Sequence, residues 1–160
     1  MTTEELIKQL ANSDESPKYS QLLQLSNLES GELSKFKSAW PSVPEMRRRE
    51  VALRLFDLSE DNLELDFTDV FMACLDDSDD NVRETATKGL SACEDRAIIR
   101  PLVALLDHDP SVVVRASAAM ALGRFASMAL DGKLITKDEE RIRDALLTTM
   151  RREDEFLEVK

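Results

Sequence analysis

A single histidine, His108, is the first place to look in this sequence for acid–base or metal chemistry. It stands between Asp107 and Asp109 in a polar stretch with the composition of a turn. The common metal sites built on histidine need a second histidine, and the chain has none. We therefore interpret His108 as an exposed turn residue, and we expect a protein with no catalytic activity, no bound metal and no cofactor.

One acidic stretch, LDDSDDN, has the residue types that bind calcium. Asp77, Asp79 and Asn81 match the first three ligand positions of an EF-hand loop. However, Val82 stands where the loop needs glycine, and Lys88 stands where it needs a bidentate glutamate. We expect Asp79 or Asp80 to cap the helix that follows, with weak cation binding as the alternative.

The two cysteines, Cys74 and Cys93, lie in apolar patterns at helical spacing, and their separation fits neither a disulfide framework nor a zinc finger. We interpret both as small core residues rather than redox groups. The chain begins MTTEELIKQL, which is acidic and amphipathic, unlike a secretion signal. No uninterrupted apolar run reaches the length of a membrane span. Together these features predict a soluble, cytoplasmic protein with no membrane partner.

The one basic cluster, Arg47 to Arg49 with Arg54, is the candidate for binding nucleic acid. The whole chain carries 32 acidic and 21 basic residues, a formal net charge of −11. Such a surface repels a phosphate backbone on average, so nucleic acid is an unfavourable partner. We favour the interpretation that the cluster is the solvated start of a helix.

The elements that must position these residues are helices. The chain has only four glycines and five prolines, and its aromatic content of 5% calls for an aliphatic core. One stretch has apolar residues at the spacing of a single buried helical face. These residues are Phe67, Val70, Phe71, Cys74 and Leu75.

An internal repeat is the most informative pattern in the chain. LDDSDDNVRETATKGL, beginning at Leu75, and LDHDPSVVVRASAAMAL, beginning at Leu106, share a Leu-Asp, a polar turn, a Val-Arg pair, and then Ala and Leu at fixed spacing. The leucines are 31 residues apart. Each copy predicts a helix, a tight turn and a second helix, and such hairpins bury their faces only by stacking into a solenoid.

These residues resemble HEAT repeats, in particular the short type first noted in phycobilisome-lyase-like proteins. The residues that carry the resemblance are Asp76, Asp79, Val82, Arg83, Ala86 and Leu90 in one copy, and Asp107, Asp109, Val114, Arg115, Ala118 and Leu122 in the other. The part of the chain before the repeat resembles the N-terminal region of bacterial HEAT-repeat proteins. The resemblance implies an all-α fold, an α–α superhelix of about eight or nine helices.

The expected organisation is a single domain over residues 1–160. Irregular capping helices occupy 1–64, two clear HEAT units occupy 65–93 and 95–130, and 136–160 begins a third, truncated unit. A truncated unit leaves apolar surface uncovered, which predicts self-association at this open C-terminal repeat.

The resemblance also implies roles for particular residues. A ladder of bonds between turn aspartates and Val-Arg arginines of neighbouring repeats would involve Asp79, Arg83, Asp109 and Arg115. Second helices line the concave, partner-binding side of such solenoids, which points to Glu84, Lys88, Ser91, Ser117 and Arg124.

The resemblance implies a non-enzymatic scaffold for protein–protein interaction, with an unidentified protein as partner. The paired His–Glu motifs of the hydroxylases built on HEAT repeats are absent. Two alternatives stay open. One is a nucleic-acid-binding module of the kind found in HEAT-like DNA glycosylases, and the other is an accessory protein resembling bilin lyases.

Overall fold

The computed structural model describes residues 1–152. Within them every regular element is a helix, so the predicted all-α class with eight or nine helices is confirmed. The α-helices are α1 (Thr3–Asn12), α2 (Tyr19–Leu22), α3 (Ser30–Ala39), α4 (Glu45–Asp61), α5 (Thr68–Cys74), α6 (Asp80–Leu90), α7 (Ile99–His108), α8 (Val112–Leu130) and α9 (Thr136–Arg151). Short 3-10 helices are η1 (Leu23–Leu25), η2 (Trp40–Ser42) and η3 (Arg96–Ile98).

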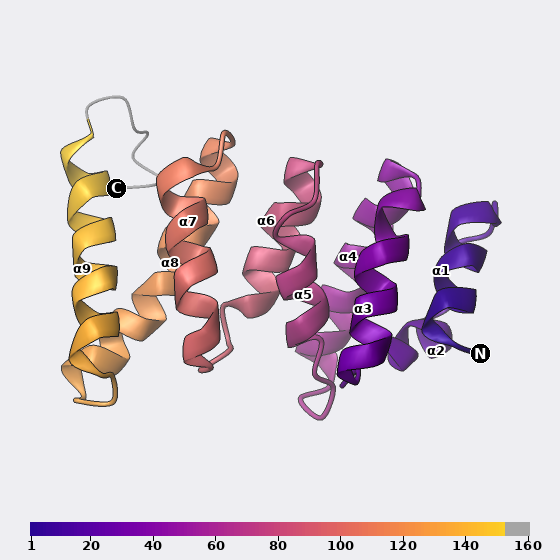
Figure 1. Ribbon diagram of the computed structural model, residues 1–160, viewed down its shortest axis with the longest axis horizontal. Coiled ribbons are helices and arrows are strands. Elements are labelled where there is room, and N and C mark those ends of the chain that lie inside the picture. The colour runs from indigo at the N-terminus through magenta and orange to yellow at the C-terminus, as the bar shows by residue number, and fades with distance from the viewer. Residues whose placement is uncertain (153–160) are drawn as a thin grey trace. The chain divides into compact units, whose positions relative to one another are not determined.

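The contacts divide the chain into two compact units, Met1–Gly89 and Leu90–Lys160. In the first unit α1, α3 and α5 lie side by side in one layer, and α2, α4 and α6 form the second layer (Figure 1). Hairpins that each contribute one helix to each layer are the arrangement that the internal repeat predicts.

The predicted buried face of α5 is confirmed. All five residues predicted to form this face, Phe67, Val70, Phe71, Cys74 and Leu75, are buried. The ring of Phe71 reaches α6 where that helix has a glycine: a Cβ built on Gly89 would lie 2.5 Å from Cε2 of Phe71. The missing side chain therefore lets the aromatic ring pack against the backbone of α6.

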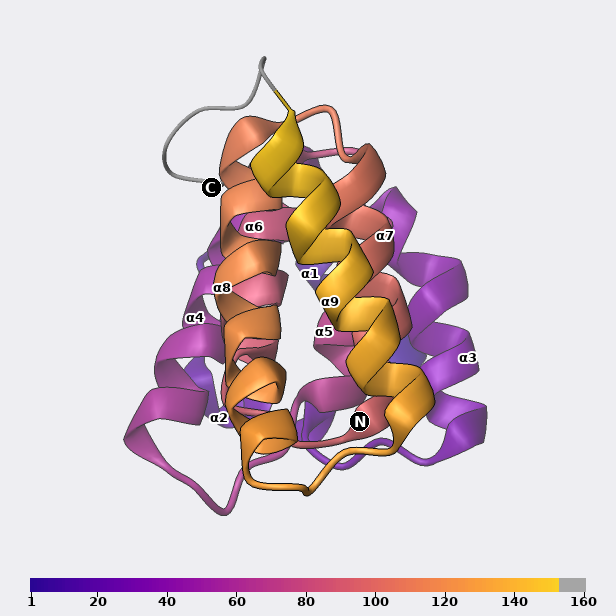
Figure 2. The ribbon, with the colours of Figure 1, turned by 90° about the vertical axis from the view of Figure 1, so that its left-hand side faces the viewer.

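In the second unit α7 packs against both α8 and α9, and α8 also packs against α9 (Figure 2). Helix α8 buries Val114, Ala118 and Leu122, the Val, Ala and Leu positions of the repeat. By length and composition α8 is apolar enough to cross a membrane, although Arg115 and Arg124 interrupt it. A core helix of a soluble protein passes the same test, and α8 supplies buried residues from Val114 to Phe125.

Helix α9 stands where the predicted third unit begins. The last part of that predicted unit, residues 153–160, lies outside the described residues. The predicted units at 65–93 and 95–130 enclose the α5–α6 and α7–α8 hairpins. The grouping of the whole chain into one domain stays a prediction.

Candidate functional site

Asp77 is the centre of a buried group of hydrogen bonds at the turn between α5 and α6. Its side chain is 2% exposed and accepts from Nε1 of Trp40 at 2.8 Å and from Nε of Arg48 at 2.9 Å. It also accepts from the backbone N–H of Asp79 at 2.9 Å. The Arg48 side chain, 9% exposed, donates Nη1 to the carbonyl of Val43 at 2.6 Å. Both buried charges are thus paired and hydrogen-bonded, as burial requires.

Asp79 caps the N-terminus of α6 and binds a second arginine. Its Oδ1 accepts the backbone N–H of Val82 at 3.1 Å, which caps α6 as the sequence predicts, and it also accepts Nε of Arg49 at 3.0 Å. The Arg49 hydrogen bond holds the pKa of Asp79 below its ordinary value, and the carboxylate raises the pKa of Arg49. The carboxylates that match calcium ligands are therefore occupied by arginines. Among residues 1–152 no three His, Cys, Asp or Glu side chains are grouped to hold a metal ion.

Arg83 and Arg115 occupy the same position in their respective turns. Each donates Nη1 to a backbone carbonyl six residues earlier, that of Asp77 at 3.0 Å and that of Asp109 at 2.8 Å. The side chains of Asp77 and Asp109 each accept a backbone N–H two residues later at 2.9 Å. By this geometry the counterpart of Asp109 is Asp77 rather than Asp79. The ladder between neighbouring repeats stays a prediction.

Arg48 is a repeat arginine that the sequence interpretation missed, and Asp77 is its partner. Arg48 precedes Leu55 by seven residues, the spacing of arginine and leucine in both copies of the repeat, and Val51 takes the place of the alanine. All three side chains are buried. The signal was hidden because Arg47, rather than a valine, precedes Arg48.

The remaining arginines of the basic cluster hold the loop between α1 and α2. Arg47 donates Nη2 to the carbonyl of Ser13, and Arg54 donates Nη1 to the carbonyl of Pro17, each at 2.9 Å. Both also pair with Glu50, at 2.8 and 3.2 Å respectively. Every arginine of the cluster thus has acidic or carbonyl partners within the first unit.

The five residues predicted to contact a partner differ in their availability. Glu84 and Lys88 form a salt bridge of 2.5 Å along α6, and Ser91 is exposed just beyond that helix. Ser117 is buried. Arg124 is exposed and pairs at 2.9 Å with a glutamate of the loop before α7. Their role as partner contacts stays a prediction.

An exposed surface on α8 is more apolar than these five predicted contact residues. Val113, Ala116 and Met120 follow one another at helical spacing on the side of α8 opposite its buried residues, and Met120 is 77% exposed. Arg124 contributes the one charge of this stripe and Ser127 continues it. A helix that is apolar on both its faces is normally buried on both. We call these five residues the α8 stripe.

The first unit carries a smaller surface of the same kind. Met46 and Leu53 lie seven residues apart on α4, on one side of the helix, and both are exposed. α4 is the second helix of its hairpin, as α8 is of the α7–α8 hairpin. Exposed aliphatic residues therefore recur on the second helix of a hairpin in both units.

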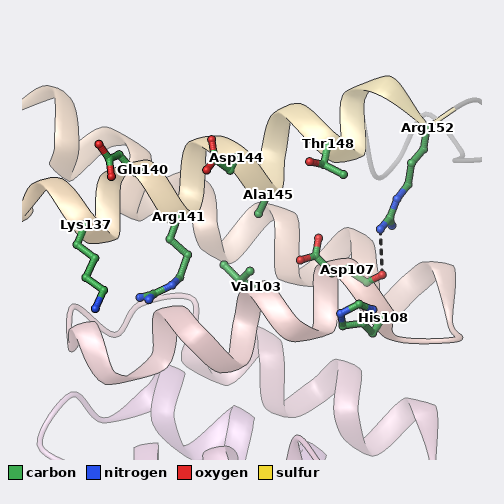
Figure 3. A pocket seen from close by; sticks show the side chains of 10 residues that line it. All are labelled: Val103, Asp107, His108, Lys137, Glu140, Arg141, Asp144, Ala145, Thr148 and Arg152. Atoms are coloured by element: carbon green, nitrogen blue, oxygen red, sulfur yellow. Dashed lines mark hydrogen bonds between the residues drawn. The ribbon is translucent and has the colours of Figure 1, made fainter.

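His108 lies at an open groove of about 590 Å³ between α7 and α9. Figure 3 shows the carboxylate of Asp107 turned toward α9, and Nη2 of Arg152 donates to the backbone carbonyl of Asp107 at 3.0 Å. One carboxylate oxygen of Asp107 is buried and has no hydrogen-bond partner among residues 1–152. Acidic and basic side chains of α9 line the opposite wall. The groove is open and of mixed charge, unlike the enclosed, largely apolar cavities that bind small substrates.

The two cysteines have different environments. Cys74 is buried, and burial strongly raises the pKa of its thiol, which leaves it in the unreactive protonated form. Cys93 is half-buried, and its Sγ accepts the backbone N–H of Asp95 at 3.4 Å. The interpretation of Cys74 as a core residue is confirmed.

Comparison with known proteins identifies the repeat. A family model described as HEAT repeats matches residues 68–157, more than half of the chain. The match begins with α5 and includes the turns before α6 and α8, whose backbone carbonyls accept hydrogen bonds from Arg83 and Arg115. No curated protein and no solved structure matches the chain. The closer resemblance to the phycobilisome-lyase-like type stays a prediction. The chain belongs to the family of HEAT-repeat proteins.

Proposed function

We propose that this chain is a non-enzymatic scaffold that binds another protein through the α8 stripe. HEAT repeats commonly serve as protein-interaction scaffolds, presenting extended surfaces to their partners. The observation that carries the proposal is the exposure of Val113 and Met120 on a helix that is already apolar on its buried side. Contiguous apolar surface of this kind marks protein contacts.

The contact is expected to be apolar at its centre. Burying a Met or Val side chain contributes about 1.5–3 kcal/mol, so Met120 is the expected anchor of the interface. The chain's net charge of −11 favours a partner with a basic rim, because opposite charge speeds encounter. Met46 and Leu53 on α4 offer the same chemistry in the first unit.

The alternative functions have less support. A nucleic-acid-binding module needs free basic side chains, and the basic cluster is committed to Asp77, Asp79, Glu50 and loop carbonyls. An accessory protein resembling bilin lyases needs an enclosed pigment pocket, and the grooves between the helices are open. A cytoplasmic location remains part of the proposal.

The test is comparative affinity capture from the cell of origin with the whole chain. At least one protein is expected to bind the unchanged chain and to be reduced about tenfold or more with Met120→Glu, because the anchor is lost. Leu23→Glu is the matched control, since Leu23 is also exposed but lies on η1 of the first unit.

Circular dichroism checks that both variants keep the helical content of the unchanged chain. If no captured protein distinguishes Met120→Glu from Leu23→Glu, the α8 stripe is not the binding surface and the proposal fails.

A further inference from the structure

A second apolar surface lies in the second unit, in a groove between α8 and α9 of about 340 Å³. The residues that line it are Ala126, Ala129, Leu130, Glu139, Ile142, Arg143, Leu146 and Leu147. Leu130 is 91% exposed, and Leu147 and Met150 are exposed on the outer side of α9. Among residues 1–152 the groove is therefore an exposed apolar face at one edge of this unit, on a different side from Met120.

The first turn of α9 contains Asp138 and Glu139 and its last turn contains Arg151, and charges of both signs lie between them. Glu139 and Glu140 lie near its N-terminus, and Arg151 lies at its C-terminus. Between them Arg143 pairs with Glu139 at 3.0 Å on the rim of the groove. This order also follows the helix dipole, which is positive at the N-terminus and negative at the C-terminus.

We propose that a second copy of this chain occupies the groove, with the two α9 helices antiparallel about a two-fold axis. The inference rests on the proposed function as a protein-binding scaffold and names one partner for a surface separate from the α8 stripe.

The charges select the antiparallel arrangement. Glu140 and Arg151 are about 16 Å apart along the helix, at 1.5 Å per residue. When two α9 helices cross near Ala145 in opposite directions, Glu140 of each copy comes opposite Arg151 of the other. A parallel pair would place like charges side by side and align the two dipoles unfavourably. A two-fold contact uses the same patch on both copies, so it closes as a dimer and does not extend into a fibre.

The apolar residues supply the centre of the same contact. Leu147 of one copy faces the groove of the other, and Met150 extends the apolar surface toward its edge. On α8 the groove is lined by Ala126 and Ala129, whose small side chains let a neighbouring helix approach closely. An apolar centre flanked by paired charges is the usual anatomy of a specific interface.

Light scattering after size-exclusion chromatography, with sedimentation equilibrium, tests the proposal on the whole chain. The unchanged chain is expected to be a dimer, Leu147→Glu a monomer, and the control Leu23→Glu a dimer. Arg151→Glu is expected to weaken the dimer about tenfold or more, and Arg151→Glu with Glu140→Arg is expected to restore it. A parallel pair would not show this restoration, because each change would still face its own copy.

Three results would overturn the proposal: a monomeric unchanged chain at concentrations up to about 1 mM, a dimer that survives Leu147→Glu, or no rescue by the charge exchange. Circular dichroism confirms that each variant is folded. The monomeric Leu147→Glu is expected still to capture the protein that Met120→Glu loses, and Met120→Glu is expected still to form dimers. Failure of the dimer and failure of the proposed function are therefore told apart.

Discussion

Replacing Asp77 by alanine is expected to destabilise the first unit by about 3–5 kcal/mol, the usual result of removing one partner of a buried ion pair. The change leaves the guanidinium of Arg48, 9% exposed, without its carboxylate. It also removes the acceptor that Trp40 Nε1 binds at 2.8 Å, and a buried donor without a partner costs about 1–3 kcal/mol. These losses are large beside the total stability of about 5–15 kcal/mol that is typical of a domain.

Two further variants separate the contribution of the hydrogen bond to Trp40 from that of the charge pairing with Arg48. Asp77→Asn keeps an oxygen that accepts from Trp40 but removes the negative charge, so its loss of stability is expected to be smaller than that of Asp77→Ala. Arg48→Met removes the charge that Asp77→Ala would leave unpaired. The double variant is therefore expected to lose less than the sum of the two single variants, by about 1–3 kcal/mol.

Trp40 itself reports the result. It is the one tryptophan of the chain and is buried beside Asp77. Urea unfolding followed by its fluorescence measures the free energy of unfolding of the region around this group of hydrogen bonds. A loss below about 1 kcal/mol for Asp77→Ala, or strict additivity with Arg48→Met, would refute the reasoning, because a screened surface pair behaves in that way.

Three other predictions concern Asp79, Gly89 and Gly123. The pKa of Asp79 is lowered in the folded protein, so the stability that this carboxylate supplies is present above its ordinary pKa of 3.8 and is lost as the pH falls below that value. Arg49→Ala is expected to make the urea midpoint of unfolding depend less on pH in this range. Gly89→Ala is expected to destabilise by about 1–3 kcal/mol in thermal unfolding because its Cβ meets Phe71. Gly123→Ala, with no heavy atom within 4 Å of the added Cβ, is expected to stabilise by about 0.5–1 kcal/mol.

The hairpins were predictable because their information is local. The 3.6-residue spacing that placed Val70, Phe71 and Cys74 on one face needs only the neighbouring sequence, and so does the match between the two copies of the repeat. The alanine and leucine positions of α6 and α8 were identified in the same way. A repeat adds a second, independent copy of each local signal, which strengthens the prediction of the stack.

The contacts of the arginines were not predictable in the same way. Arg47 and Arg54 donate to carbonyls of the loop before α2, more than thirty residues away. A backbone carbonyl belongs to every residue type, so no sequence pattern marks it as an acceptor. Composition and periodicity show where a side chain faces, but the conformation of a distant loop decides which carbonyl it meets.

Binding and stability should therefore reside on different residues of this chain. Arg48, Arg83 and Arg115 each donate Nη1 to carbonyls of the turn just before their own helix, which fixes each of these helices relative to its turn. The α8 stripe, with Met120, lies on the outside of a helix held in this way. A surface carried by rigid elements loses little conformational entropy on binding. Changes at the arginines are expected to lower the unfolding free energy, whereas Met120→Glu changes partner binding in a chain that stays folded.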